Sequence, residues 1–321
     1  MTRSTLPTTA PGTVLGTPAA PLRPYVLGYR GYRLALRRPL RRLEVPTDVV
    51  TVALAFEGTM SLTDAVSPEP ATAFGSVAAG LRRTATIAEH AGVLHGLAVS
   101  LTPQGAFRAF GPLAGELGGH WAEAGDVLGP RLRALTDRLA HAPSWPARFA
   151  MLDGYFGALF AYGPDWDPSV HWVWRQLRHT HGLVPIGDLV EGTGWSRRRL
   201  ELRFREHLGL APKQAAGILR LQHTLHVLTA HEERTAGDHP FGNRPTGART
   251  TGARTTGADL ATRCGYYDQS HLDRTFRAMV GRSPSAFLAS RRTAAALPEP
   301  AGRVTDRVTG RVTSTLLDAG G

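Results

Sequence analysis

Two short segments of the chain repeat one arrangement of residues. Each has a glycine followed by an aromatic residue, then a leucine and a phenylalanine four positions apart, and finally a glycine and a proline three positions apart. These residues are Gly194, Leu200, Phe204, Gly209 and Pro212 in the first segment, and Gly265, Leu272, Phe276, Gly281 and Pro284 in the second. Because apolar residues at i and i+4 share one face of a helix, the positions between them face solvent.

The solvent-facing positions carry side chains that can hydrogen-bond to nucleic acid. They are Arg197, Arg198, Glu201, Leu202 and Arg205 in the first segment, and Gln269, Ser270, Asp273, Arg274 and Arg277 in the second, with His271 beside them. Arginine pairs with guanine, glutamine pairs with adenine, and glutamate accepts a hydrogen bond from cytosine. The alternative is an arginine-rich helix surface that is only hydrated. Two occurrences of the pattern favour base recognition.

Local signals predict the helices that would position these residues. The hydroxyl of Ser196 can cap a helix that ends before Gly209, where glycine favours the helix C-terminus. A helix before each turn glycine then completes two helix-turn-helix units. Between the units, a linking helix over 213–229 of about 18 residues would span roughly 27 Å. That length suits two recognition helices in successive major grooves about 34 Å apart.

Residues 170–290 resemble the DNA-binding domain of the AraC/XylS family of bacterial transcription regulators. The resemblance is carried by Gly-Trp-Ser-Arg-Arg-Arg-Leu at 194–200 and, above all, by Gly-Tyr-Tyr-Asp-Gln-Ser-His-Leu at 265–272. It implies base-reading positions at Arg198, Glu201, Leu202, Gln269, Ser270 and Arg274. Leu202 departs from the polar or basic residue often found at that position, so we expect contact with a thymine methyl there instead.

The resemblance implies a sequence-specific, effector-responsive transcription regulator, an activator or a repressor, and not an enzyme. Its principal partner would be double-stranded DNA. A small-molecule effector, a second copy in a homodimer and RNA polymerase are further candidate partners, whereas no membrane and no cofactor are expected. The alternative function is a small-molecule-modifying enzyme domain tethered to a DNA-binding module.

The formal net charge of +11 is concentrated in the second half of the chain. Residues 170–292 hold 18 arginines and one lysine against 10 acidic residues, whereas residues 1–169 hold 15 arginines against 13 acidic residues. Arginine makes up 36 of the 37 basic residues, and its planar fork binds phosphate or guanine. The excess favours a polyanionic partner for the second half, with a general arginine bias as the alternative.

The first half predicts strands followed by helices. Alternation at 25–29 and the apolar runs 49–56 and 92–101 indicate short strands, and apolar residues at three- and four-residue spacing over 104–162 indicate amphipathic helices. The predicted class is α+β: a β-rich, cupin-like or small-barrel sensing or dimerisation domain over 22–165, then an all-α double helix-turn-helix domain over 169–290. Gly-Pro-Asp-Trp-Asp-Pro at 163–168 marks the boundary. The first domain resembles, more faintly, sensor domains of the same family.

Three low-complexity regions are predicted to be disordered. Residues 1–21 are rich in Thr, Pro, Ala and Gly and form a leader, with no apolar run of signal-peptide length. Residues 230–258 form an insertion between the units that contains a five-residue repeat, and residues 293–321 form a tail in which Arg-Val-Thr recurs.

No enzymatic or metal-binding motif has adequate spacing. A single cysteine, Cys264, excludes an internal disulfide, a four-cysteine zinc site and family relatives with alkyl-transfer repair chemistry. It also favours a reducing, cytoplasmic location. His90 and His95, with Glu89, could bracket a metal, but histidines in a strand-rich region are more often structural, so no metal site is predicted.

Overall fold

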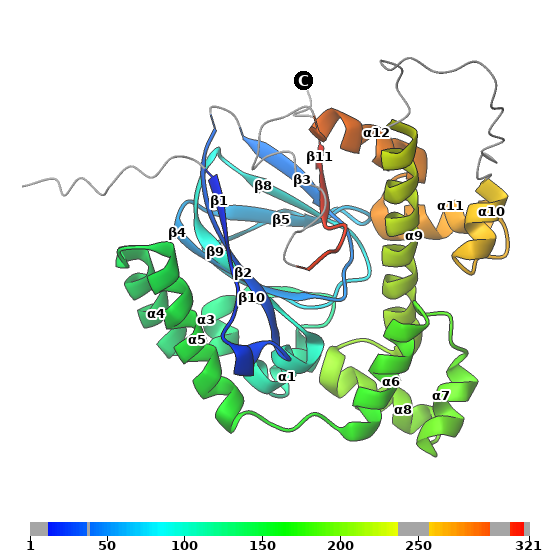
Figure 1. Ribbon diagram of the computed structural model, residues 1–321, viewed down its shortest axis with the longest axis horizontal. Coiled ribbons are helices and arrows are strands. Elements are labelled where there is room, and N and C mark those ends of the chain that lie inside the picture. Colours follow the sequence, from blue (N-terminus) through cyan, green and yellow to red (C-terminus); the bar gives the residue numbers. More distant parts are fainter. Residues whose placement is uncertain (1–11, 37–38, 237–256, 296–308, 318–321) are drawn as a thin grey trace, which may run out of the picture.

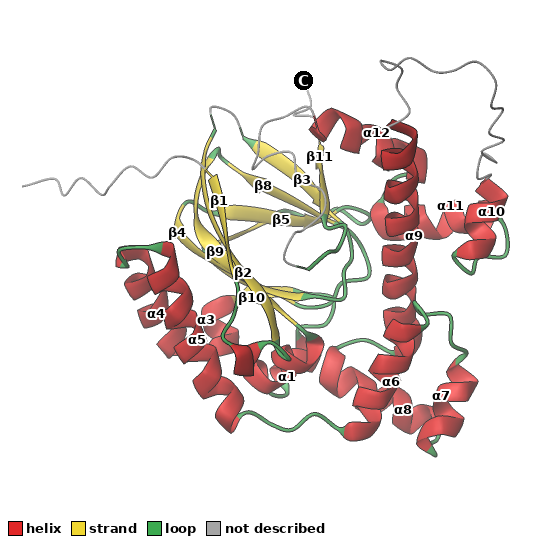
Figure 2. Ribbon diagram, viewed as in Figure 1, coloured by secondary structure: helices red, strands yellow, loops and turns green. Residues whose placement is uncertain are grey.

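The computed structural model of the protein describes residues 12–36, 39–236, 257–295 and 309–317. A strand-rich first half is followed by a helical second half (Figure 2), which confirms the predicted α+β class. None of the helices in the described ranges combines the length and apolar character that crossing a bilayer requires.

The first half is a sandwich of two antiparallel sheets. The first sheet contains, in spatial order, β1 (Gly12–Gly16), β2 (Val26–Ala35), β9 (Val93–Leu101), β4 (Val50–Glu57), β7 (Ser76–Ala79) and β10 (Trp121–Glu123). The second sheet contains β11 (Ser314–Leu317), β3 (Leu40–Glu44), β8 (Thr86–His90), β5 (Met60–Asp64) and β6 (Thr72–Phe74). The strands predicted at 25–29, 49–56 and 92–101 are β2, β4 and β9, three neighbours in the first sheet. One face of these strands is apolar and buried, at Val52, Leu54, Leu97 and Val99 among others, which accounts for their clear signal.

Helices cover the outer face of the first sheet (Figure 1). They are α1 (Pro103–Phe110), α2 (Leu113–Glu116), α3 (Ala124–Leu128), α4 (Pro130–His141) and α5 (Trp145–Tyr162). The predicted spacing places Leu132, Leu135 and Leu139 on the buried side of α4. Thr102 and Ser144 cap α1 and α5 through side-chain oxygens that accept backbone N–H groups.

The second half contains seven helices within the described residues. They are α6 (Pro168–His179), α7 (Ile186–Thr193), α8 (Arg197–Leu208), α9 (Pro212–Ala236), α10 (Gly257–Arg263), α11 (Gln269–Val280) and α12 (Pro284–Ala295). Residues 163–167 of the predicted boundary lie between α5 and α6, and Pro168 is the first residue of α6. The linking helix α9 extends seven residues beyond the predicted end at 229, so the predicted insertion is shorter than 230–258. Its remainder, 237–256, lies outside the described residues.

The predictions of a disordered leader and a disordered tail are wrong in part. Residues 12–16 form β1, which pairs with β2, and residues 314–317 form β11, which pairs with β3. Both are edge strands that are held by backbone hydrogen bonds to a single neighbouring strand, so their own side-chain pattern is weak. Strand β11 itself reads Ser-Thr-Leu-Leu, so the Val-Thr pairs of the repeat lie outside it and the strand contains a single β-branched residue.

The two halves are packed against each other through two contacts. The outer face of the second sheet, at Leu43 and Val45, shares a buried cluster with Leu225 of α9, Phe276 of α11 and Phe287 of α12. Helices α1 and α2 pack against α8 on the other side, within a second cluster. The first domain therefore contacts both helix-turn-helix units.

Candidate DNA-binding surface and sensor cavity

The first helix-turn-helix unit consists of α7, a turn at Gly194 and α8. Gly194 has φ +66°, a left-handed conformation that glycine adopts without strain. The Ser196 hydroxyl accepts the backbone N–H of Arg199 at 3.2 Å, as predicted for the cap of α8. Leu200 and Phe204 are fully buried. The opposite face of α8 is thereby turned to solvent.

The second unit repeats this geometry with α10 and α11. Gly265 has φ +71° in the turn, and the carboxylate of Asp268 accepts the backbone N–H of His271 at 2.6 Å to cap α11. Leu272 and Phe276 are buried, as predicted. Both units therefore combine a left-handed glycine, a side-chain cap and an inward Leu/Phe pair.

Most of the predicted base-reading side chains are exposed. In α8 the exposed ones are Arg197, Arg198, Leu202 and Arg205, and in α11 they are Gln269, Ser270, Arg274 and Arg277. Glu201 is half-buried, and its carboxylate lies 3.4 Å from the Nε of Arg197. His271 is half-buried too, and its Nδ1 accepts the Tyr267 N–H at 3.4 Å. These two side chains are engaged in local contacts.

The side chain of Gln269 lies against the start of α10. A Cβ added to Gly257 would come within 2.3 Å of its Oε1. In this structure Gln269 therefore packs beside Gly257 and does not project freely from α11. Reading an adenine would require a different rotamer of this side chain.

Two aromatic residues beside the recognition helices, half-buried Trp195 and exposed Tyr267, are not indicated as contact residues by the sequence interpretation. Arg199 lies over the Trp195 ring, 4.8 Å from its centroid, and Tyr267 in the second turn is 91% exposed. The i, i+4 spacing of Trp195 and Arg199 on either side of the cap was the available signal. An exposed tyrosine or a stacked arginine at a turn can contact a phosphate of bound DNA.

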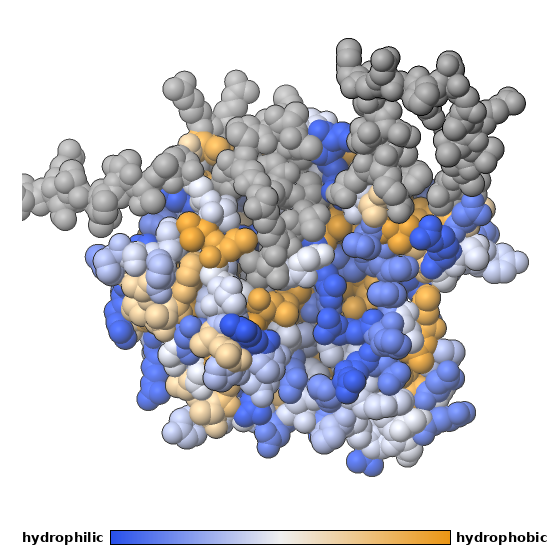
Figure 3. Space-filling view, viewed as in Figure 1, coloured by the Kyte–Doolittle hydropathy of each residue, from blue (hydrophilic) through white to orange (hydrophobic). Residues whose placement is uncertain are grey.

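The linking helix α9 sets the distance between the units. Its 25 residues correspond to about 37 Å, close to the spacing of about 34 Å between successive major grooves. One unit lies beside its N-terminal end and the other beside its C-terminal part (Figure 1). Hydrophilic residues gather on the visible face around α6, α8 and α9 (Figure 3).

The first domain holds the C-terminal end of each recognition helix. At α8, a Cβ on Gly118 would come within 2.3 Å of the Gly209 Cα, so the two backbones touch where no side chain fits. At α11, the carbonyl of Met279 accepts the Ala85 N–H at 2.7 Å. The capped N-terminal ends, where Arg198 and Ser270 lie, are left away from these contacts.

His207 joins α8 to the first domain as a neutral imidazole. Its ring stacks on Phe107 with centroids 4.1 Å apart, its Nδ1 donates to the Arg203 carbonyl at 2.9 Å, and its Nε2 accepts the Asp167 N–H at 3.3 Å. Burial and the nearby Arg203 lower its pKa, although its hydrogen bond to the Arg203 carbonyl and the carboxylates of Asp167 and Glu206 act in the opposite direction. A proton on Nε2 would face the Asp167 backbone N–H, so two donors would oppose each other and this hydrogen bond would be lost.

We expect acid to weaken this contact. Because the folded pKa of His207 lies below that of an unfolded histidine, about 6.5, the unfolded state binds more protons and stability falls as pH decreases below about 7. Urea unfolding between pH 7.5 and 5.5 should show a smaller loss of stability in His207→Phe than in the wild type. His141→Phe, which removes an exposed imidazole from α4, is the control; equal slopes in all three proteins would contradict the expectation.

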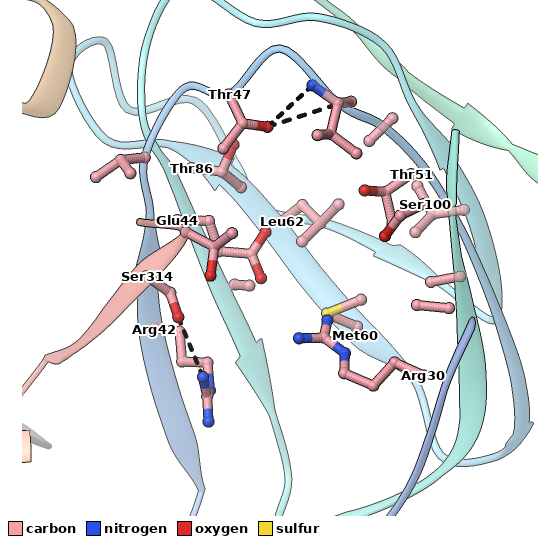
Figure 4. A pocket seen from close by; sticks show the side chains of 18 of the residues that line it. Arg30, Arg42, Glu44, Thr47, Thr51, Met60, Leu62, Thr86, Ser100 and Ser314 are labelled. Carbon is pink, nitrogen blue, oxygen red and sulfur yellow. Dashed lines mark hydrogen bonds between the residues drawn. The ribbon is translucent and has the colours of Figure 1, made fainter. Parts of the chain in front are cut away.

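A cavity of about 250 Å³ lies between the two sheets. Alternate residues of facing strands point into it, among them Thr51 and Ser100 of the first sheet and Leu62 and Thr86 of the second (Figure 4). Its wall is mainly apolar, with one cluster of charged residues: Arg30, Arg42 and Glu44. The sequence interpretation did not find this cluster, because nothing local shows that Arg30 of the first sheet faces Arg42 and Glu44 of the second across one cavity.

Burial changes the proton affinities of the cavity residues. It lowers the pKa of Arg42 to about 10 and raises the pKa of Tyr32 to about 12. His90 also lines the cavity; burial lowers its pKa, and its Nδ1 accepts the Gly92 N–H at 3.2 Å. His95 instead packs between Phe56 and Trp145 outside the cavity, so the two histidines do not converge on one ion.

No family model matches the chain, and no curated protein matches it. Among solved structures, ToxT from Vibrio cholerae aligns with a TM-score of 0.42 at 10% identity, over 81% of this chain and 97% of ToxT. Unsaturated fatty acid bound ToxT aligns with 0.39 at 9% identity, over 81% and 94%. The AraC-like transcriptional activator CuxR aligns with 0.23 at 15% identity, over 69% and 86%. At these scores and identities no function can be transferred, so it must be inferred from the residues.

Proposed function

We propose that the chain is a sequence-specific DNA-binding transcription regulator of the AraC/XylS type. The observation that carries the proposal is the pair of helix-turn-helix units on one linking helix, each with a capped recognition helix whose outer face is rich in arginine. The residues that match the family pattern, from Gly194 to Leu200 and from Gly265 to Leu272, form the turns and the first turns of these helices.

Affinity and sequence choice come from different contacts in this proposal. Arginines of the second half, including Arg199 over Trp195, bind phosphates and supply affinity that decreases with salt. Base edges are read by Arg198 and Leu202 in one groove and by Ser270 and Arg274 in the next, with Arg205 and Arg277 on the same groove-facing sides. Glu201, Gln269 and His271 belong to the proposed set and must leave their present contacts to read a base.

The cavity of the first domain is the proposed effector site. Its apolar wall with one charged cluster has the composition of a small-molecule site. The alternative of an enzyme needs a nucleophile beside a base. His90 is the imidazole that lines the cavity; because its Nδ1 accepts the Gly92 N–H, its Nε2 carries the proton of the neutral ring and cannot accept one from a nucleophile. A cytoplasmic location, homodimer formation and contact with RNA polymerase complete the proposal.

Selection of binding sites from random DNA by the full-length protein tests this function. A direct repeat with one helical turn between half-sites is expected if both units read DNA. A single half-site would confine base recognition to one unit. Failure to enrich any sequence would contradict the proposal. Chemical conversion of a small molecule that the protein binds would favour the enzyme alternative.

Arg274→Ala is expected to cost about 1–3 kcal/mol of binding free energy on the selected site and to relax the preference at one base pair. Arg274 is exposed on the outer face of α11. Competition electrophoresis over all four bases at each position measures both effects. Arg131→Ala, an exposed arginine on α4, is the control. If Arg274→Ala weakens binding equally for all sequences, Arg274 contacts phosphate and does not read a base.

A further inference from the structure

The loop between α6 and α7 has a backbone conformation that its neighbours must enforce. His181 and Gly182 both have positive φ, 51° and 77°, and His181 is the one non-glycine residue with positive φ in the described parts of the chain. A side chain other than glycine adopts this conformation only where surrounding contacts compensate the strain. We call residues 181–183 the α6–α7 loop and ask what holds it.

The linking helix α9 holds this loop with residues of one face. A Cβ on Gly182 would overlap with the Ala216 carbonyl oxygen, so the loop backbone lies directly on the helix. Nη2 of Arg220 donates to the Gly182 carbonyl at 3.0 Å. The imidazole of His181 stacks on that of His223, with centroids 4.3 Å apart and planes within 12°. Positions 216, 220 and 223 follow the i, i+4, i+7 spacing of a single helix face.

The same loop contacts the turn of the second helix-turn-helix unit. A Cβ on Gly265 would overlap with Cδ2 of Leu183, so this leucine lies against the turn backbone. The guanidinium of Arg220, which binds the loop, also lies 5.8 Å from the ring centroid of buried Tyr266, within the range of a cation–π contact. The α6–α7 loop therefore joins the first unit directly to the second.

Chain continuity alone does not determine where the second unit lies. Residues 237–256 separate the end of α9 from the start of α10, and about 20 residues can span up to about 70 Å. Contacts between folded elements must therefore set the position of α10 and α11 relative to α9. Leu221 and Leu225 of α9 supply apolar contacts, and the α6–α7 loop adds a contact between the two units themselves.

The loop acts at the end of α11 that the first domain does not hold. The first domain bonds the C-terminal end of α11, where the Met279 carbonyl accepts the Ala85 N–H. Gly265 and Tyr266, which the loop and Arg220 contact, precede the N-terminal end of this helix. Contacts near both ends limit the tilt of the second recognition helix relative to the first unit.

Building on the proposed DNA-binding function, we propose that the α6–α7 loop couples the two units rigidly, so that the protein accepts one spacing between half-sites. Leu183 and Arg220 are positioning residues: they read no base and set where the second unit lies. Moving one half-site by a base pair shifts it by about 3.4 Å along the DNA and rotates it by about 35°. Coupled units can follow this change only by breaking the contacts of Leu183 and Arg220.

Competition binding to DNA with altered spacing tests the coupling. The two selected half-sites are compared at their selected spacing and with one base pair inserted or removed between them. The wild type is expected to lose at least about 10-fold in affinity at either altered spacing, because both units can no longer bind together. Leu183→Ala and Arg220→Ala should reduce this loss several-fold and leave the affinity for a single half-site unchanged, which a general loss of structure would not do.

Two control variants match these substitutions. Leu27→Ala removes a leucine of similar exposure from β2, 37% against 43% for Leu183. Arg131→Ala removes an exposed arginine from α4. Both controls are expected to keep the full loss of affinity at altered spacing. Because the result is a ratio of two affinities of one protein, a uniform effect of the lost charge in Arg220→Ala cancels.

Distances between two spin labels test the coupling without DNA. Glu191→Cys on α7 and Thr262→Cys on α10 place labels at exposed positions of the two units, whereas the natural Cys264 is buried and stays unlabelled. The doubly labelled protein is expected to give one narrow distance distribution. Adding Leu183→Ala should broaden it, and adding Leu27→Ala should not.

The outcomes separate the coupling from the regulator function. Equal losses at altered spacing in Leu183→Ala, Arg220→Ala and the two controls overturn the coupling, as does a wild type that binds all spacings equally or selects a single half-site. A distance distribution that Leu183→Ala leaves unchanged also overturns it. Failure to select any DNA sequence would contradict the regulator function, while the spin-label distances would still decide whether the loop couples the units.

Discussion

Phe276→Ala is expected to lower the free energy of unfolding by about 3–5 kcal/mol, the cost of removing a large buried aromatic ring and leaving a cavity. Phe276 is fully buried, and its ring meets Phe287 of α12 edge-on with centroids 5.9 Å apart. It also belongs to the cluster that joins α9 and α11 to Leu43 of the second sheet. Domains have only about 5–15 kcal/mol of stability, so the second unit should detach or unfold.

Urea unfolding followed by circular dichroism measures this loss. Tyr267→Ala is the matched control, because Tyr267 precedes the same helix but is 91% exposed, and surface substitutions usually change stability by less than about 0.5 kcal/mol. Specific DNA binding should be lost in Phe276→Ala at temperatures where Tyr267→Ala still folds. A loss of stability below about 1 kcal/mol would show that Phe276 is not packed as described.

Asp48→Asn is expected to cost about 3 kcal/mol, the lower end of the range for removing one partner of a buried ion pair. The Asp48 side chain is only 4% exposed, whereas Arg311 and Arg178 are 30% and 49% exposed and can be partly hydrated after the change. Asp48 pairs with Arg311, just before β11, and with Arg178 of α6. The backbone amides of β11 should therefore also exchange hydrogen faster in the variant.

Asp126→Asn provides the control for this substitution. Asp126 pairs with Arg133 at 3.5 Å, and both side chains are about 70% exposed, so the pair contributes at most about 1 kcal/mol. The melting temperatures of the two variants, measured at low and at high salt, compare the contributions of the two ion pairs. Equal changes in melting temperature would mean that the Asp48 pair is no stronger than a surface pair and that other contacts hold residues 309–317 in place.

The sequence predicted the recognition helices well because their signals are local. The Ser196 cap, the turn glycines and the i, i+4 pairs Leu200/Phe204 and Leu272/Phe276 are each defined within a few residues. The helices and turns that these residues form depend little on the rest of the fold. The side-chain details were less predictable: Gln269 lies against Gly257, a neighbour that the turn geometry brings close.

The strands at the two ends of the chain could not be predicted in the same way. Strand β11 pairs with β3 about 270 residues earlier, and β1 pairs with β2 across a Pro-rich turn. An edge strand takes much of its stability from the partner's hydrogen bonds and little from its own apolar pattern. The composition of these two segments therefore predicts disorder, although both are strands.

By itself, the sequence determined the class of the fold, the two helix-turn-helix units and the side chains that face outward from them, because helix periodicity and capping act over short distances. Only the tertiary structure decided which charges meet. Arg30, Arg42 and Glu44 come from two different sheets and converge on one cavity, and Arg311 meets Asp48 across 263 residues. Such contacts depend on strand register, which is set by the packing of the whole sandwich.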